Sequence, residues 1–196
     1  IAIDFQNFKI SEFLAYLNPD EKLASGNLNG DFVIEEPFGD FGFLADIYVE
    51  QLRVLGEDLG ILELAGRSIK GNKYDFNLAV SEGAADLELT GDYIADIDGA
   101  TMNMDLDINE LKMEALDGFS LGELNDGSGT LNGNFKMNGK LVDLEYQGFL
   151  RFNNAAFTVT KLNAPFTLLK ETVSIDNEGI SMSNFTIRDA KENKLT

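Results

Sequence analysis

The octet SGTLNGNF, residues 128–135, recurs almost unchanged as SGNLNGDF, residues 25–32. Glycines at this spacing suit either a loop that cradles a phosphate or the turns and bends of a repeated β-structure. The phosphate-binding motifs that the octet approaches need a helix directly after the glycines, because the helix N-terminus directs backbone N–H groups at the phosphate. Here the flanking residues alternate as in a strand, with Leu131, Gly133 and Phe135 on one face. The octet therefore predicts β-structure, with glycine where strands turn or the sheet bends.

The octet belongs to a longer internal repeat. At an offset of 103 residues, ASGNLNGDFVI (24–34) aligns with GSGTLNGNFKM (127–137), and six of these eleven positions are identical. The same offset pairs residues 8–10 with residues 111–113. Repetition of one register indicates two copies of one unit. We therefore expect a single continuous segment over 1–196, cut from a longer protein and built from units 1–100 and 101–196, the second incomplete.

Within each unit the main signal is alternation of apolar and polar residues. TMNMDLDI (101–108) places its Met, Leu and Ile residues on one face, and LEYQGFLRF (144–152) behaves in the same way. This period of two predicts fourteen to sixteen short strands, with turns at 125–129, 137–140, 152–155 and 176–179. Helix is limited to one or two turns per unit, such as one that has Ser11 as its N-cap and ends near Pro19. The predicted fold is all-β, an elongated antiparallel or mixed sheet.

Composition excludes several classes of function. The chain has 34 acidic and 15 basic residues, a net charge of −19, which disfavours nucleic acid because its phosphates need Lys and Arg. It has no Cys and no His, so thiol nucleophiles and the commonest metal ligand are missing. A calcium-loop pattern around Asp96, Asp98 and Gly99 fails at its first ligand position, which is Ile94. We expect no enzyme activity, no cofactor and no metal site.

The apolar strand faces are the remaining candidate for function. They could form an ordinary β-sandwich core, but a repeating unit favours an elongated sheet, which would leave a continuous apolar groove. The residues predicted to line this groove are Phe32, Ile34, Leu106, Ile108, Leu131, Phe135, Met137, Leu144, Tyr146, Leu150, Phe152, Phe157, Val159, Phe166, Leu168, Val173, Ile175, Ile180, Met182, Phe185 and Ile187.

The order of these motifs resembles the repeat of the TamB family, which is part of the AsmA-like bridge proteins. A glycine-bounded strand, NGKLVDLEYQG, is followed by a strand pair that opens with FLRFNNAAFTV and by a segment from TLLKETVSIDNEG to the C-terminal end. The resemblance covers residues 106–196 well and residues 1–100 more faintly.

The resemblance implies a β-taco, a long sheet folded lengthwise into a U with an apolar interior. It also implies a periplasmic location, an inner-membrane anchor in the full-length protein and pairing with an outer-membrane barrel of the BamA superfamily. The expected function is a lipid conduit in which phospholipid acyl chains lie in the groove between the inner and outer membranes. The alternative is a structural or chaperone-like β-repeat that assists outer-membrane protein assembly by strand augmentation, without lipid.

Overall fold

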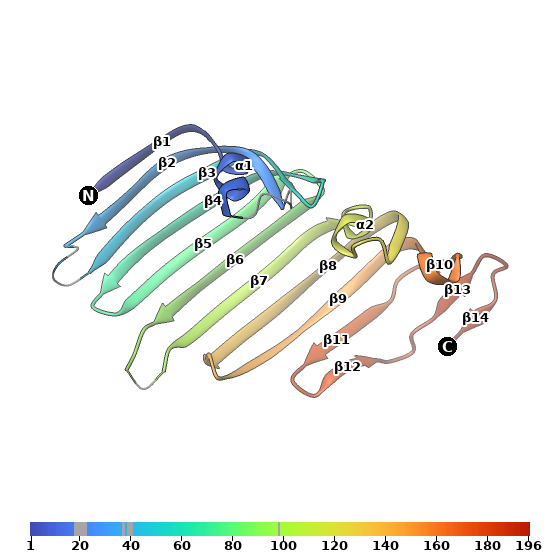
Figure 1. The fold of residues 1–196 in the computed structure, drawn as a ribbon. Coiled ribbons are helices and arrows are strands. Elements are labelled where there is room, and N and C mark those ends of the chain that lie inside the picture. Colours follow the sequence, from blue (N-terminus) through green and yellow to red (C-terminus); the bar gives the residue numbers. More distant parts are fainter. Residues whose placement is uncertain (18–22, 37, 39–40, 98) are drawn as a thin grey trace.

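The computed structural model describes residues 1–17, 23–36, 38, 41–97 and 99–196. Over these ranges the chain forms one 14-stranded sheet, two α-helices and one short 3-10 helix (Figure 1). The elements in chain order are β1 (Ala2–Lys9), α1 (Ile10–Leu17), β2 (Ala24–Glu35), β3 (Gly42–Val54), β4 (Glu57–Lys70), β5 (Lys73–Glu82), β6 (Ala85–Ile94), β7 (Thr101–Lys112), α2 (Ala115–Phe119), β8 (Leu124–Lys140), β9 (Asp143–Val159), η1 (Thr160–Leu162), β10 (Ala164–Leu168), β11 (Thr172–Asp176), β12 (Gly179–Met182), β13 (Ile187–Asp189) and β14 (Lys194–Leu195).

The sheet is an antiparallel meander. From β1 to β9 each strand pairs with the next one along the chain, and β9 then pairs with two shorter strands, β10 and β11. The all-β prediction is confirmed. All pairs between described strands are antiparallel, so the mixed sheet that we also allowed does not form.

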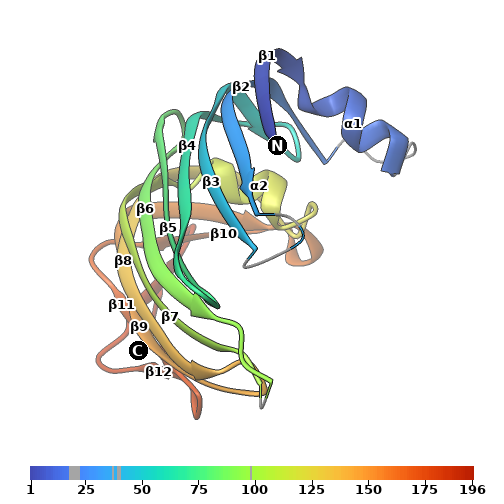
Figure 2. The same cartoon turned by 90° about the vertical axis from the view of Figure 1, so that its left-hand side faces the viewer.

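The strands bend together, so that the sheet forms a trough that stays open on one side (Figure 2). Helix α2 lies inside this curve. Its Leu116 packs against a buried cluster of Met113, Leu131, Ala155 and Leu168. Ile108 and Leu150 of the sheet pack against the same cluster. The face of the sheet that carries these apolar side chains is therefore the concave one.

The trough has two long rims of different construction. Strands β1 and β7 lead into α1 and α2 at one rim, which we call the helix rim. The connections that contain residues 71–72, 95–97, 99–100 and 141–142 lie at the opposite rim, which we call the hairpin rim. The order strand, helix, strand, strand occurs twice, as β1–α1–β2–β3 and as β7–α2–β8–β9, at the offset of 103 residues found in the sequence. The predicted unit boundaries, 1–100 and 101–196, stay a prediction.

The glycines of both copies of the octet lie inside strands. Residues 25–32 lie in β2 and residues 128–135 in β8, and the pairing register shifts at Gly26 in the first and at Gly129 in the second. Gly26 has φ 151° and Gly129 has φ 82°, values that a residue with a Cβ rarely adopts. The octets therefore mark two equivalent β-bulges, which bend and twist a strand locally.

Several local predictions were wrong. Residues 125–129, 137–140 and 152–155 were predicted as turns but lie within β8 and β9, where Asp126, Gly139 and Asn154 adopt positive φ. These strands are also longer than expected, at 17 residues each. Helix α1 begins at Ile10, so Ser11 is inside the helix and is not its N-cap. The predicted helix end near Pro19 lies outside the described residues.

Candidate functional site: an open apolar trough

The concave face is built from rows of side chains that run across the sheet, because residues paired across antiparallel strands point to the same side. We name three rows by their position between the rims. The inner row, nearest the helix rim, consists of Leu28, Val49, Leu62, Val80, Leu87, Ile108, Gly133, Leu150, Val173 and Met182. The middle row consists of Gly30, Ile47, Leu64, Leu78, Leu89, Leu106, Phe135, Gly148, Ile175 and Ile180. The outer row consists of Phe32, Ala45, Gly66, Phe76, Gly91, Met104, Met137 and Tyr146.

No charged residue occurs in these three rows. Tyr146 is their one polar side chain, and it lies in the row nearest the hairpin rim. One quarter of the residues in the chain are charged, yet none of them lies in these rows, which extend across up to ten strands. The rows therefore form an uninterrupted apolar floor, which we call the trough floor.

Glycines let large side chains lie flat on this floor. A Cβ at Gly91 would lie 2.7 Å from Cζ of Phe76, its partner on β5. A Cβ at Gly66 would lie 3.2 Å from Cε2 of Phe43, and one at Gly148 would lie 2.6 Å from Cγ of Phe135. Each ring therefore occupies space that its neighbour leaves empty. This covers the glycine backbone with apolar surface and keeps the trough shallow.

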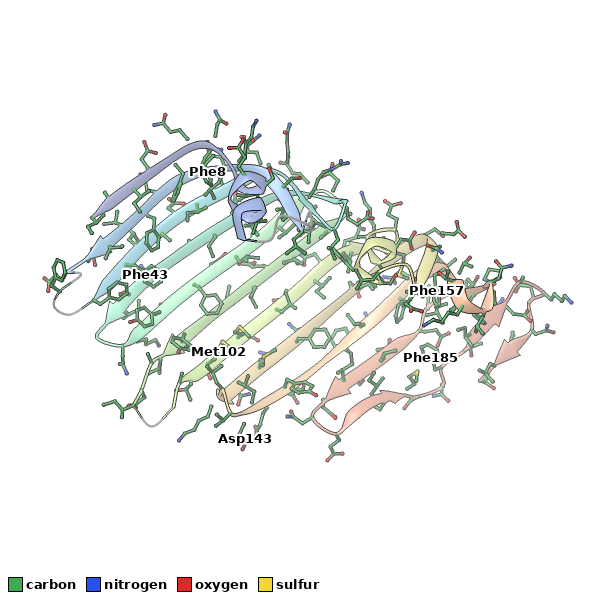
Figure 3. The ribbon with its side chains drawn as sticks, in the orientation of Figure 1. Phe8, Phe43, Met102, Asp143, Phe157 and Phe185 are labelled. Carbon is green, nitrogen blue, oxygen red and sulfur yellow. The ribbon has the colours of Figure 1, made fainter. Side chains whose placement is uncertain are left out.

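An aromatic ladder follows the hairpin rim. The rings of Phe32 and Phe43 are stacked with centroids 5.9 Å apart, Phe43 and Tyr74 are stacked at 5.5 Å, and Tyr74 and Tyr93 are tilted at 6.1 Å. Beyond Tyr93 the same row continues through Met102 to Gly139 and Leu144. Figure 3 labels Phe43 and Met102 along this line.

The solvent exposure of the concave face differs between the two rims. Near the helix rim the side chains are dry, since Met113, Leu131, Ala155 and Leu168 are at most 3% exposed beneath α2. Toward the hairpin rim the floor is partly accessible, and Tyr146 is 38% exposed. The trough is thus closed beneath α2 on the helix rim and open along the hairpin rim.

The total accessible surface reflects this open form. A folded monomer of this mass, 21.5 kDa, exposes about 9,200 Å² on average. This chain exposes 12,485 Å². The difference, about 3,300 Å², arises because the concave face does not pack against a second layer as in a β-sandwich. Large exposed apolar surfaces of this kind mark binding sites in soluble proteins.

The convex face is polar and acidic. Lys136 lies opposite Asp105 on the neighbouring strand, with Nζ 2.9 Å from Oδ1. The hydrogen bond and the charge of Asp105 raise the pKa of Lys136. Asp4, Asp31 and Asp46 pair directly across three neighbouring strands. Within the ranges that the structure describes, no group of three or more acidic residues is arranged to hold a metal ion. Of the calcium-like pattern, Asp98 lies outside the described residues.

The residues predicted from sequence fall into three groups. Most lie on the trough floor or its hairpin rim, namely Phe32, Ile34, Leu106, Ile108, Phe135, Met137, Leu144, Tyr146, Leu150, Val173, Ile175, Ile180 and Met182. Phe152, Phe157, Phe185 and Ile187 pack against the buried cluster near the helix rim, and Phe166 pairs with Phe157. Val159 pairs with Ala164 at the end of β9.

Two of the predicted lining residues need correction. Leu131 and Leu168 are each 3% exposed, so they belong to the packed core and offer no surface to a ligand. Helix α2 is responsible, because Leu116 covers this part of the concave face. Ile180 and Met182 show the opposite extreme, at 66% and 56% exposed, because β12 pairs only with β11 among the strands described.

Sequence reasoning missed most of the N-terminal half of the trough floor. Ile47, Leu64, Leu78 and Leu89 continue the middle row but were not predicted. The signal was present, because KYDFNLAV (73–80) and ADLELTG (85–91) alternate as strongly as the C-terminal strands do. Alternation in the N-terminal unit would therefore have found them.

No protein-family model, no curated protein and no solved structure matches this chain. The resemblance to the TamB family is accordingly a hypothesis that rests on the order of sequence motifs. No helix among the described residues is long and apolar enough to cross a membrane.

Proposed function

We propose that the trough binds the acyl chains of phospholipids and serves as a segment of a lipid conduit. The observation that carries the proposal is the trough floor, three neighbouring rows without a charge in which most residues stay partly exposed to solvent. An apolar surface of this size is unfavourable in water unless something covers it. Acyl chains can cover this surface without hydrogen bonds or ion pairs. The apolar side chains of the floor provide no partners for such contacts.

The dimensions suit hydrocarbon chains. From β2 to β12 the inner row crosses ten strands, which at a spacing of about 4.8 Å corresponds to a length of roughly 40 Å. One acyl chain spans about half of the ~30 Å hydrocarbon core of a bilayer, or about 15 Å. The trough is thus longer than one lipid. Each buried CH₂ group contributes about 0.8 kcal/mol, so ten of them hold a chain firmly without a head-group site.

Uniformity of the floor favours transport over storage. A lipid that moves along the rows exchanges Leu, Ile, Val, Met and Phe contacts for similar ones. It meets no desolvated charge, which would form a barrier of several kcal/mol. A periplasmic location, an inner-membrane anchor and a BamA-superfamily partner follow from the TamB resemblance and belong to the same proposal.

A second candidate function is strand augmentation of outer-membrane protein clients. The observation that favours it is β1, which ends the sheet and pairs only with β2 among the described strands. An unpaired strand edge can accept another strand by main-chain hydrogen bonds. This function would use the sheet edge and leave the trough floor empty.

Native mass spectrometry of the purified chain, with lipid extraction in parallel, separates the two functions. The conduit predicts co-purifying phospholipid or uptake of phospholipid from vesicles, with the strand content unchanged by circular dichroism. Folded protein that neither carries nor takes up lipid would exclude the conduit. Binding of an unfolded outer-membrane barrel protein by that lipid-free chain, lost when β1 is deleted, would support augmentation instead.

A further inference from the structure

The two rims of the trough differ in a way that sets the direction of a bound lipid. Beneath α2 the helix rim is dry and closed, as shown by Met113 at 2% exposed and Ala115 at 0%. The hairpin rim is half-exposed and contains the aromatic ladder. Where α2 covers the trough, a molecule can therefore enter only from the hairpin rim.

Three tyrosines of the concave face lie on the hairpin side. Tyr74 and Tyr93 are paired with each other on β5 and β6, and Tyr146 lies in the outer row on β9. Among the hydrogen bonds of the described residues, none involves the hydroxyl groups of these three side chains. A tyrosine combines an apolar ring with a polar tip, and this combination suits the boundary between hydrocarbon and water.

The charge of the hairpin rim distinguishes between lipids. Among the side chains that the structure describes, its turns and strand ends contain the acidic residues Glu35, Asp96, Asp143, Asp176 and Glu178 and the basic residues Lys73 and Lys140. An anionic head group would be repelled by this excess of carboxylates. A zwitterionic head group brings an ammonium group that the carboxylates attract, and its glycerol ester oxygens are neutral acceptors for tyrosine O–H.

We infer that a zwitterionic diacyl phospholipid lies across the trough, with its ester groups at Tyr74 and Tyr93 on the hairpin rim and its acyl chains directed toward the helix rim. This inference rests on the proposed function and adds an orientation and a head-group class to it. Along β7, Met102 at the rim and Ile108 in the inner row are six residues apart, or about 20 Å. This distance is sufficient for one acyl chain of about 15 Å.

The orientation can be measured by tryptophan quenching, because the chain has no Trp. Met102→Trp reports from the hairpin rim, and Ile108→Trp reports from the inner row on the same strand, opposite Gly133. Each variant is mixed with phosphatidylcholine vesicles whose acyl chains are brominated either next to the ester or next to the methyl end. Tyr48→Trp on the convex face is the control.

We expect the ester-proximal bromines to quench Met102→Trp at least twofold more strongly than the methyl-end bromines do, and the reverse for Ile108→Trp. Equal quenching of both reporters by both lipids, or the reversed pattern, would overturn the orientation while leaving acyl-chain binding intact. Quenching no greater than that of Tyr48→Trp in either reporter would overturn the proposed function itself. Leu150→Trp, which also lies beside Gly133, replaces Ile108→Trp if circular dichroism shows loss of strand.

The role of the hydroxyl groups is tested separately. The double variant Tyr74→Phe/Tyr93→Phe keeps both rings and removes both donors. It should weaken phosphatidylcholine binding by roughly two- to tenfold per hydroxyl and leave binding of diphenylhexatriene, a hydrocarbon probe without an acceptor, unchanged. Tyr48→Phe should change neither. If the double variant binds phosphatidylcholine as the parent chain does, the ester contact is wrong.

Discussion

Phe76 on β5 and Gly91 on β6 are directly paired, and the phenyl ring occupies the space that a side chain at position 91 would need. A Cβ at Gly91 would lie 2.7 Å from Cζ of Phe76. The same arrangement joins Phe135 to Gly148 in the C-terminal half of the trough. A large ring over a bare backbone makes the floor smooth, so its height varies little from strand to strand.

Gly91→Ala should therefore destabilise the chain by about 1–3 kcal/mol, because either the ring of Phe76 or the backbone at Asn103 must move. Urea unfolding followed by circular dichroism measures the change. Introducing Phe76→Leu first should reduce the cost of Gly91→Ala, since the shorter side chain leaves space. Equal costs in the two backgrounds would show that the ring does not set the constraint.

Gly129 tests whether the bulge of the octet is essential. It has φ 82°, and a Cβ there would collide with the backbone carbonyl of Asn154. Gly129→Ala should lower the free energy of unfolding by at least about 1–2 kcal/mol. The neighbouring substitution Ser128→Ala, at an exposed position without positive φ, should change it little. A similar small effect for both would mean that the bulge is dispensable.

Charge placed in the trough should block lipid. Leu150 and Phe152 lie on the concave face of β9, whereas Glu145 lies on the convex face of the same strand. We expect Leu150→Arg or Phe152→Glu to reduce labelling by a photoreactive phospholipid at least tenfold, and Glu145→Arg to leave it unchanged. Circular dichroism must accompany the labelling, because a buried charge can unfold a strand. Equal labelling of all three folded variants would refute the trough as the lipid site.

The acidic convex face should be a source of instability. Asp31 faces Asp4 on one side and Asp46 on the other, and all three are exposed. Like charges directly opposite in a sheet are unfavourable, so Asp31→Asn should stabilise the chain by about 0.2–1 kcal/mol at low salt. The gain should shrink in high salt, where repulsion is screened. A gain that is independent of salt would point to a cause other than charge.

The turn between β13 and β14 should depend on pH. The side-chain amide of Asn193 and the backbone N–H of Lys191 donate to the carboxylate of Asp189 and lower its pKa. A carboxyl group whose folded pKa is lowered contributes stability that is complete above its unfolded pKa and is lost as the pH falls through the folded pKa. The protection factors of the amides at residues 191 and 193 should be lower in Asp189→Ala than in the parent chain at neutral pH, and the parent should fall to the variant's values only in acid. The same protection factors in parent and variant at neutral pH would contradict the assignment.

Much of the fold follows from alternation alone. Alternation is a property of neighbouring residues, since successive side chains of a strand point to opposite faces. It assigned Met102, Met104 and Leu106 to one face without any knowledge of their partners. The chain also separates its charges from its apolar face within each strand, so the acidic exterior and the charge-free floor were predictable.

The sequence did not distinguish a turn from a bulge. Residues 152–155, FNNA, have the composition of a turn, but Asn154 continues β9 as an irregularity. The outcome depends on the neighbours, because β8 and β10 pair with β9 on either side of this point. Composition describes what a residue tolerates, whereas the partner strands determine which tolerated conformation forms.

The sequence by itself determined the strands, their two faces and the repeat that spaces the two octets. Only the tertiary structure decided that the sheet bends into a trough, that α2 covers Leu131 and Leu168, and that the trough is closed beneath α2 while the hairpin rim is open. The physical reason is that curvature and burial are sums over many strands. Each bulge and the twist of each strand contribute a small bend, and the direction of the total depends on the register of all strands together.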